Sequence, residues 1–253
     1  LESSLHHDVR RIVAAKRAVS SLDVINNRNI FPLDTFQNEI SYRKIMVLLF
    51  ELKVDEATAI LMEMIKNSPE DLWTSSAALE VWNQWLKEKM DLDDELQFVV
   101  GSQIVRQLKD HEMGSQSYVD ISRKTAQSAF DLHIATNDKQ KGEEALRISR
   151  ILVDQNPLIK ELLVLNAEIE MLLGDKQKSL QRWKTIAYGS KIGTNQWLRA
   201  KYFIVKLLSE NSPEDAIAIL DQYVILYPSY GDDPFGTQLR LLHKELRGGE
   251  DGS

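Results

Sequence analysis

The chain has 253 residues, of which 43% are hydrophobic and 27% are charged, and it contains no cysteine. This composition is ordinary for a folded protein and excludes wholesale disorder, disulfide bonds and metal sites with cysteine ligands. A net charge of -7 argues against electrostatic binding of nucleic acid or anionic lipid, and no apolar run reaches the roughly 18 residues of a membrane span.

Helical periodicity runs through the whole sequence. Apolar residues at steps of three and four predict helices near 5–22, 36–52, 57–65 and 92–108. Ser-Pro-Glu-Asp occurs at 68–71 and at 212–215, and a serine N-cap followed by proline predicts that a helix begins at each copy. Residues 97–100 are the best candidate for a strand, although they are equally compatible with a buried helical turn.

A repeated pattern indicates how these helices are organised. Three predicted helices begin with two acidic residues and an alanine, and a proline stands twelve residues after each alanine. A weaker fourth copy opens with Ser179, has Trp183 four residues later and lacks the proline. The marker alanines, with the prolines that follow them, are Ala57 and Pro69, Ala145 and Pro157, and Ala216 and Pro228.

This pattern resembles the tetratricopeptide (TPR) repeat, a 34-residue helix pair in which small residues let the two helices approach closely. Ala145 and Ser179 are 34 residues apart. In the clearest unit, Ala167 matches the small position of the first helix and Gly174 the turn, while Ser179 and Trp183 match the small and bulky positions of the second helix. The resemblance implies an all-α protein, a right-handed α-α superhelix (TPR-like solenoid) of about a dozen antiparallel helices. The usual aromatic and Leu-Gly residues of the first helix are mostly missing, so the repeats are degenerate, and a looser helical-repeat relative is the alternative.

The resemblance covers residues 126–228 well and 33–69 less well. A polar stretch that begins near residue 110 is the expected boundary. We therefore expect N-terminal degenerate helical repeats in 1–110, TPR-like repeats in 111–247 and a disordered tail in 248–253.

The sequence contains no pattern typical of a catalytic, metal or cofactor site. His6 and His7 are adjacent, so on a helix they point about 100° apart and do not converge on one ion. His111 lacks a second histidine four residues later, and His133 lies among apolar positions that predict a packed or groove-edge residue. With five scattered histidines, no cysteine and no glycine-rich phosphate loop, we expect no enzyme activity, no metal and no cofactor.

Two clusters leave alternatives open. Trp82 and Trp85 share one helix face with Trp73 nearby, which favours core packing, with an exposed aromatic patch for a partner as the alternative. A basic stretch in the first helix favours a solvated face, with contact to a membrane or nucleic acid as the alternative. This stretch consists of Arg10, Arg11, Lys16 and Arg17.

The resemblance also implies a binding surface, because the first helices of successive pairs line a concave groove that usually binds a protein or peptide. The family's clamp for acidic tails is absent, since Val164 and Glu168 stand where a lysine and an asparagine would. A groove of glutamate and aromatic residues suits a neutral or basic partner better. The residues carried over to the groove are Gln127, Phe130 and Ile134, then Glu161, Val164 and Glu168, and then Trp197, Lys201 or Tyr202, depending on the register of the third pair.

The sequence thus predicts a non-catalytic scaffold for a protein or peptide partner. The alternative is an accessory or assembly domain of a larger enzyme, cell-envelope or coat complex whose active part lies elsewhere. The chain opens without methionine, so we expect residues before Leu1, and the absence of cysteine fits the cytoplasm or the bacterial periplasm. The sequence makes no prediction about the oligomeric state.

Overall fold

The computed structural model of the chain describes residues 13–14, 16–17, 19–21, 24, 36–232 and 234–248. Helices make up most of this part, which contains no strand, so the all-α prediction is confirmed. Residues 97–100, the candidate strand, lie inside a helix. Lys16 and Arg17 are exposed, whereas His6, His7, Arg10, Arg11 and residues 249–253 of the expected tail lie outside the described residues.

The contacts of the chain divide it into two compact units, residues 1–132 and 133–253. This division lies within one helix, α7 (Val119–Thr136). The boundary expected near residue 110 and the three domains drawn from the sequence stay predictions.

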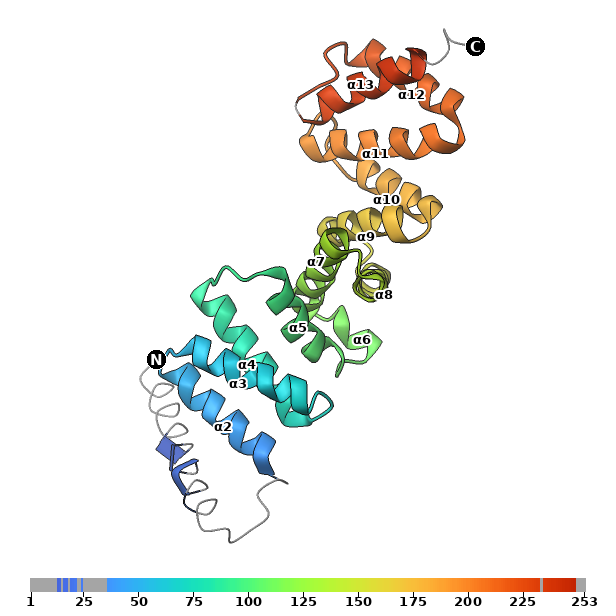
Figure 1. Cartoon of the computed structure of the whole chain (residues 1–253). Coiled ribbons are helices and arrows are strands. Elements are labelled where there is room, and N and C mark those ends of the chain that lie inside the picture. The colour runs from blue at the N-terminus through green and yellow to red at the C-terminus, as the bar shows by residue number, and fades with distance from the viewer. Residues whose placement is uncertain are drawn as a thin grey trace. The chain divides into compact units, whose positions relative to one another are not determined.

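In the first unit, consecutive helices pack side by side from α2 to α5, and α2 also contacts α4 (Figure 1). Contact between alternate helices is typical of stacked helix pairs, in which each pair lies against the next. Besides the start of α7, the helices of this unit are α2 (Gln37–Phe50), α3 (Val54–Asn67), α4 (Leu72–Glu88), α5 (Asp94–Val105) and α6 (Asp110–Met113).

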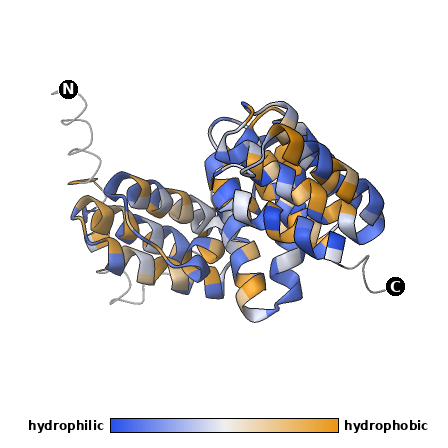
Figure 2. Ribbon diagram, turned by 90° about the horizontal axis from the view of Figure 1, so that it is seen from above, coloured by the Kyte–Doolittle hydropathy of each residue, from blue (hydrophilic) through white to orange (hydrophobic). Residues whose placement is uncertain are grey.

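The second unit repeats this arrangement. Each helix from α8 to α13 contacts the next, and α11 also contacts α13. The helices carry both hydrophobic and hydrophilic residues (Figure 2), as expected when each buries one face against its neighbours. They are α8 (Lys139–Gln155), α9 (Lys160–Leu173), α10 (Lys176–Tyr188), α11 (Asn195–Asn211), α12 (Pro213–Leu226) and α13 (Phe235–Gly248).

The marker alanines pack as the repeat predicts. Ala57, Ala145 and Ala216 lie in α3, α8 and α12 and have no exposed surface, and neither has Ser179 in α10. The residues four and seven positions after these four small residues are also buried. They are Leu61 and Met64, Ser149 and Leu152, Leu220 and Tyr223, and Trp183 and Ile186. In α3, α8, α10 and α12 the small residues of the pattern therefore lie at buried positions, as a repeat of packed helix pairs requires.

The repeated proline acts through the residue before it. Ser68, Asn156 and Tyr227 precede the three prolines and share one backbone conformation, with φ of -147°, -130° and -135° and ψ of 60°, 60° and 74°. Proline disfavours the helical conformation in the residue before it. Each of the three still donates its backbone N–H to the carbonyl four residues earlier, at 2.8–2.9 Å, and the helix ends there. The fixed offset of proline therefore fixes where α3, α8 and α12 end.

Only one of the two Ser-Pro-Glu-Asp copies begins a helix as predicted. Ser212 is the N-cap of α12 and Pro213 its first residue, although the serine side chain makes no capping hydrogen bond. At the other copy, α4 begins three residues later than expected, because Asp71 is the N-cap and accepts the backbone N–H of Trp73 at 2.7 Å. The prediction for Ser68 is therefore wrong, since a carboxylate further along the turn caps the helix instead.

The paired tryptophans of α4 lie in the core of the first unit. Trp82 and Trp85 are almost fully buried, with ring centroids 6.0 Å apart. Core packing is therefore the correct interpretation of their spacing. Trp73, half-buried at the other end of α4, packs against Tyr42 of α2 at 5.2 Å.

Candidate functional site

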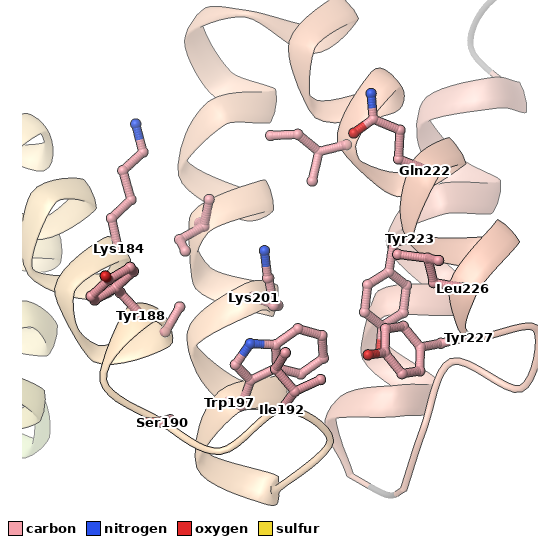
Figure 3. Close-up of a pocket in the computed structure, with 13 residues that line it drawn as sticks. Lys184, Tyr188, Ser190, Ile192, Trp197, Lys201, Gln222, Tyr223, Leu226 and Tyr227 are labelled. Atoms are coloured by element: carbon pink, nitrogen blue, oxygen red, sulfur yellow. The ribbon is translucent and has the colours of Figure 1, made fainter.

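A large pocket in the second unit lies between α10, α11 and α12 (Figure 3). Its volume is about 690 Å³, which is within the usual range for ligand-binding pockets. Three helices and the connection between α10 and α11 supply its walls. The pocket is lined by Lys184, Ala187, Tyr188, Ser190, Ile192, Trp197, Lys201, Ile204, Ile219, Gln222, Tyr223, Leu226 and Tyr227.

Stacked aromatic rings form one wall of this pocket. Trp197 on α11 stacks on Tyr223 of α12 at 5.8 Å and meets Tyr227 edge-on at 5.5 Å. The Tyr223 hydroxyl donates a hydrogen bond to the carbonyl of Tyr230 at 3.0 Å. Burial, with a smaller effect from Tyr227, raises the pKa of Tyr223 to about 12. Tyr223 therefore stays protonated, and its hydroxyl serves to fix the wall in place.

Large apolar side chains are exposed at the rim of the pocket. Tyr188, the last residue of α10, is 96% exposed, and Ile192 and Leu226 are also mostly exposed. Ile192 lies in the connection between α10 and α11 and lines the pocket. The next residue, Gly193, has a φ of 82°, a conformation that favours glycine. Exposed apolar residues gathered in one place are typical of a binding surface.

Two lysines give the pocket a positive charge. The Lys201 ammonium lies 5.4 Å from the centre of the Trp197 ring, and burial lowers the pKa of Lys201. Lys184 comes from α10 on the opposite side (Figure 3). No aspartate or glutamate lines the pocket, and within the described ranges Lys201 has no ion pair with a carboxylate.

The three residues of α11 that were expected in the groove do not all lie on one surface of the helix. Trp197 and Lys201 line the pocket. Tyr202 does not, because its ring contacts Phe203 at 5.1 Å and Phe235 of α13 at 6.1 Å. This places Tyr202 toward α13 and the other two residues toward α10 and α12. Which of the three residues faces a peptide-binding groove stays a prediction.

The expected residues of α9 do not reach the pocket. Glu168 forms an ion pair with Arg199 of α11, so part of its charge is already neutralised. Val164 is half-buried and Glu161 is exposed. Their place in a peptide-binding groove stays a prediction.

The remaining expected residues belong to α7. Gln127 donates from its amide nitrogen to both carboxylate oxygens of Asp131 at 3.0 Å. Phe130 is only 5% exposed and lies in the core, which leaves its ring little surface for a partner, whereas Ile134 is exposed. A groove role for Gln127 and Ile134 stays a prediction.

Most of the pocket was not predicted from the sequence. Tyr223 stands seven residues after the marker Ala216, and nothing in the local pattern marks Tyr188, Ile192 or Leu226 as its neighbours. One signal was available: Tyr223 and Tyr227 are four residues apart on a helix and so share a face with each other. Their position beside Trp197 depends on how α12 packs on α11.

A second cluster links α12 to α13. The Tyr230 hydroxyl and the Nδ1 of His243 lie 2.6 Å apart, and the Nε2 of His243 lies 2.9 Å from Asp221. Arg247 also donates to both oxygens of Asp221, at 2.5 Å. Each of these polar side chains thus has a hydrogen-bond partner within the fold, and the cluster links α13 to α12.

The described residues hold no group of three or more histidine, cysteine, aspartate or glutamate side chains placed to bind a metal ion. In the same part of the chain, no helix combines the length and the apolar character that a membrane span requires.

No family model matches the chain, and no curated protein matches it. Two solved structures match, both of the nearly identical TPR-like repeats of a Podosopora anserina protein described as a kinesin light chain. One, a variant with a single substitution, is 13% identical with a TM-score of 0.39, over 82% of this chain and 95% of that chain. The other is 12% identical with a TM-score of 0.39, over 84% of this chain and 96% of that chain. We draw nothing about function from matches this distant.

Proposed function

We propose that the protein is a non-catalytic scaffold and that the pocket between α10, α11 and α12 binds a segment of a partner protein. The observation that supports this proposal is the combination of an aromatic wall with an exposed apolar rim. Trp197 packs against two tyrosines, and Tyr188 and Leu226 are exposed beside them. Aromatic residues in well-packed surface depressions carry much of the binding energy of protein interfaces.

A rigid site of this kind favours binding because little conformational entropy is lost when the partner docks. Three walls of the pocket belong to helices packed against their neighbours, so the spacing of these walls is fixed before the partner arrives. The groove expected along α9 and α11, which includes Glu168 and Tyr202, remains a second surface for the same scaffold function.

The experiment that tests the proposal compares proteins captured from an extract of the source cells by three forms of the chain. These are the wild type, a Tyr188→Ala/Leu226→Ser variant and a Leu158→Ser control, since Leu158 is 89% exposed and does not line the pocket. We expect a partner that the wild type and the control retain and that the double variant captures about tenfold less. If no captured protein depends on Tyr188 and Leu226, this pocket is not the binding surface.

A further inference from the structure

The charge of the pocket is opposite to that of the chain. The chain carries a net charge of -7, yet the residues that line the pocket include two lysines and no acidic side chain. A surface of one sign attracts the opposite sign, and complementary charge selects partners as well as speeding their association. The charge of the lining therefore favours an acidic occupant.

Lys201 provides the most specific evidence. Its ammonium lies 5.4 Å from the centre of the Trp197 ring, the residue is half-buried, and burial takes part of the water from the charged group. Some cations of α10 and α11 have carboxylate partners, as Lys176 pairs with Glu210 and Arg199 with Glu168, and Lys201 has none among the residues that the structure describes. A partly desolvated ammonium without such a partner is stabilised when a carboxylate arrives, because charge-assisted hydrogen bonds are strong in such surroundings.

The apolar part of the surface shows what must accompany the carboxylate. Figure 3 shows Lys201 extending from α11 between Tyr188 and Lys184 on one side and Tyr223 and Leu226 on the other. An anion bound to Lys201 therefore lies next to the aromatic wall and the apolar rim. Tyr188 points almost entirely into solvent, and a small anion would leave it uncovered, whereas a peptide segment would cover it.

We infer that the pocket between α10, α11 and α12 binds a peptide segment that places a carboxylate on Lys201 beside a large apolar side chain packed against Trp197, with Lys184 adding positive charge to the same pocket. This inference rests on the proposed function and adds the chemistry of the partner. It differs from the groove predicted from the sequence, for which a neutral or basic partner was expected. The carboxylate belongs either to an aspartate or glutamate side chain or to the end of the partner chain.

The test selects ligands from a library of random peptides of about 12 residues, displayed with a free C-terminus and sorted against the full chain. Selected peptides are then synthesised in three forms: unchanged, with each acid replaced by its amide, and with an amidated C-terminus. Binding of each form is measured for the wild type and for a Lys184→Met/Lys201→Met variant. A Lys178→Met variant is the control, because it removes a positive charge from α10 outside the pocket.

We expect the selected peptides to combine an acid with an aromatic or large aliphatic residue. The double lysine variant should bind them at least about tenfold more weakly, and the control should bind them as the wild type does. If a side-chain acid makes the contact, the peptide in which that acid is replaced by its amide should bind the wild type and the double variant equally. If the end of the peptide makes the contact, the peptide with an amidated C-terminus should do so instead. Raising the salt concentration should weaken the unchanged form more than the amide form.

Two other results would overturn the inference and are distinguishable. In the first, the selected peptides contain no acid, bind the double lysine variant as tightly as the wild type, and lose binding to the Tyr188→Ala/Leu226→Ser variant. This result would exclude an acidic partner and leave the proposed function intact. The absence of any selected peptide that depends on Tyr188 and Leu226 would exclude both the acidic partner and this pocket as a peptide-binding surface.

Discussion

The hydroxyl of Ser179 on α10 donates a hydrogen bond of 2.7 Å to the backbone carbonyl of Ala167 on α9. Both residues are fully buried. A bond from so short a side chain to the backbone of another helix requires the two helices to pass close together at this point. The small residues that resemble the TPR pattern therefore set the spacing of this hairpin.

Two substitutions at Ser179 separate its hydrogen bond from its size. Ser179→Ala removes the bond and should lower the free energy of unfolding by about 1 kcal/mol. Ser179→Leu also forces extra volume between α9 and α10 and should cost a further amount of about 1–3 kcal/mol. Urea unfolding measures both. Equal stability of the two variants would show that the size of this residue does not limit the approach of the helices.

An ion pair between a partly exposed arginine and a buried carboxylate joins α8 to the end of α9. The Glu170 carboxylate, whose side chain is 2% exposed, accepts from Arg150 at 2.6 and 2.9 Å and from the Asp175 backbone N–H at 2.9 Å. Burial by itself raises the pKa of Glu170, but the bonds from Arg150 and Asp175 outweigh it and hold the pKa below the ordinary value of 4.5. The folded protein thus binds this proton less readily than the unfolded chain.

The lowered pKa of Glu170 predicts how the stability of a Glu170→Gln variant depends on pH. The contribution of the ionised carboxylate is complete above about pH 4.5 and is lost as the pH falls through the lowered pKa of the folded state. At pH 7 the variant should be less stable than the wild type by about 1.5–3 kcal/mol. Urea midpoints at a series of pH values should show this gap narrowing as the pH falls below about 4.5. A gap that stays constant as the pH falls would rule out the carboxylate as its source.

Gly174, at the turn between α9 and α10, leaves room for the same carboxylate. A Cβ atom at this position would overlap the Oε2 of Glu170 and lie 3.0 Å from its Cδ. Because Arg150 and Asp175 hold that carboxylate in place, Gly174→Ala should cost about 1–3 kcal/mol. The cost should fall when the same substitution is made in a Glu170→Ala background, as a double-mutant cycle measures. Equal costs in the two backgrounds would mean that the carboxylate is not what requires glycine here.

The fold was largely predictable because its signals are local. Helical periodicity and the marker alanines depend only on residues within one or two helices. The offset of Pro69, Pro157 and Pro228 also acts locally, through the backbone conformation of the residue before each proline. The start of α4 was misplaced because two capping residues, Ser68 and Asp71, compete within one turn, and the sequence does not rank them.

The site was less predictable because it depends on packing between helices. Trp197 and Lys201 were among the expected residues and do share a pocket. Tyr188 and Ile192 reach it only through the course of the α10–α11 connection, which no periodic pattern encodes. The cluster of Asp221, Tyr230 and His243 was likewise missed, since its members come from α12, the following loop and α13.

The central structural claim is that the marker alanines are points of close approach between helices, and α3 and α12 offer matched controls for it. Ala57 and Ala216 are fully buried, whereas Ala59 and Ala218, two residues further along the same helices, are exposed. The direct test is the free energy of unfolding of four alanine-to-leucine variants, one at each position. Ala57→Leu and Ala216→Leu should lose about 1–3 kcal/mol, whereas Ala59→Leu and Ala218→Leu should stay within about 0.5 kcal/mol of the wild type. Equal losses within each pair would contradict the claim.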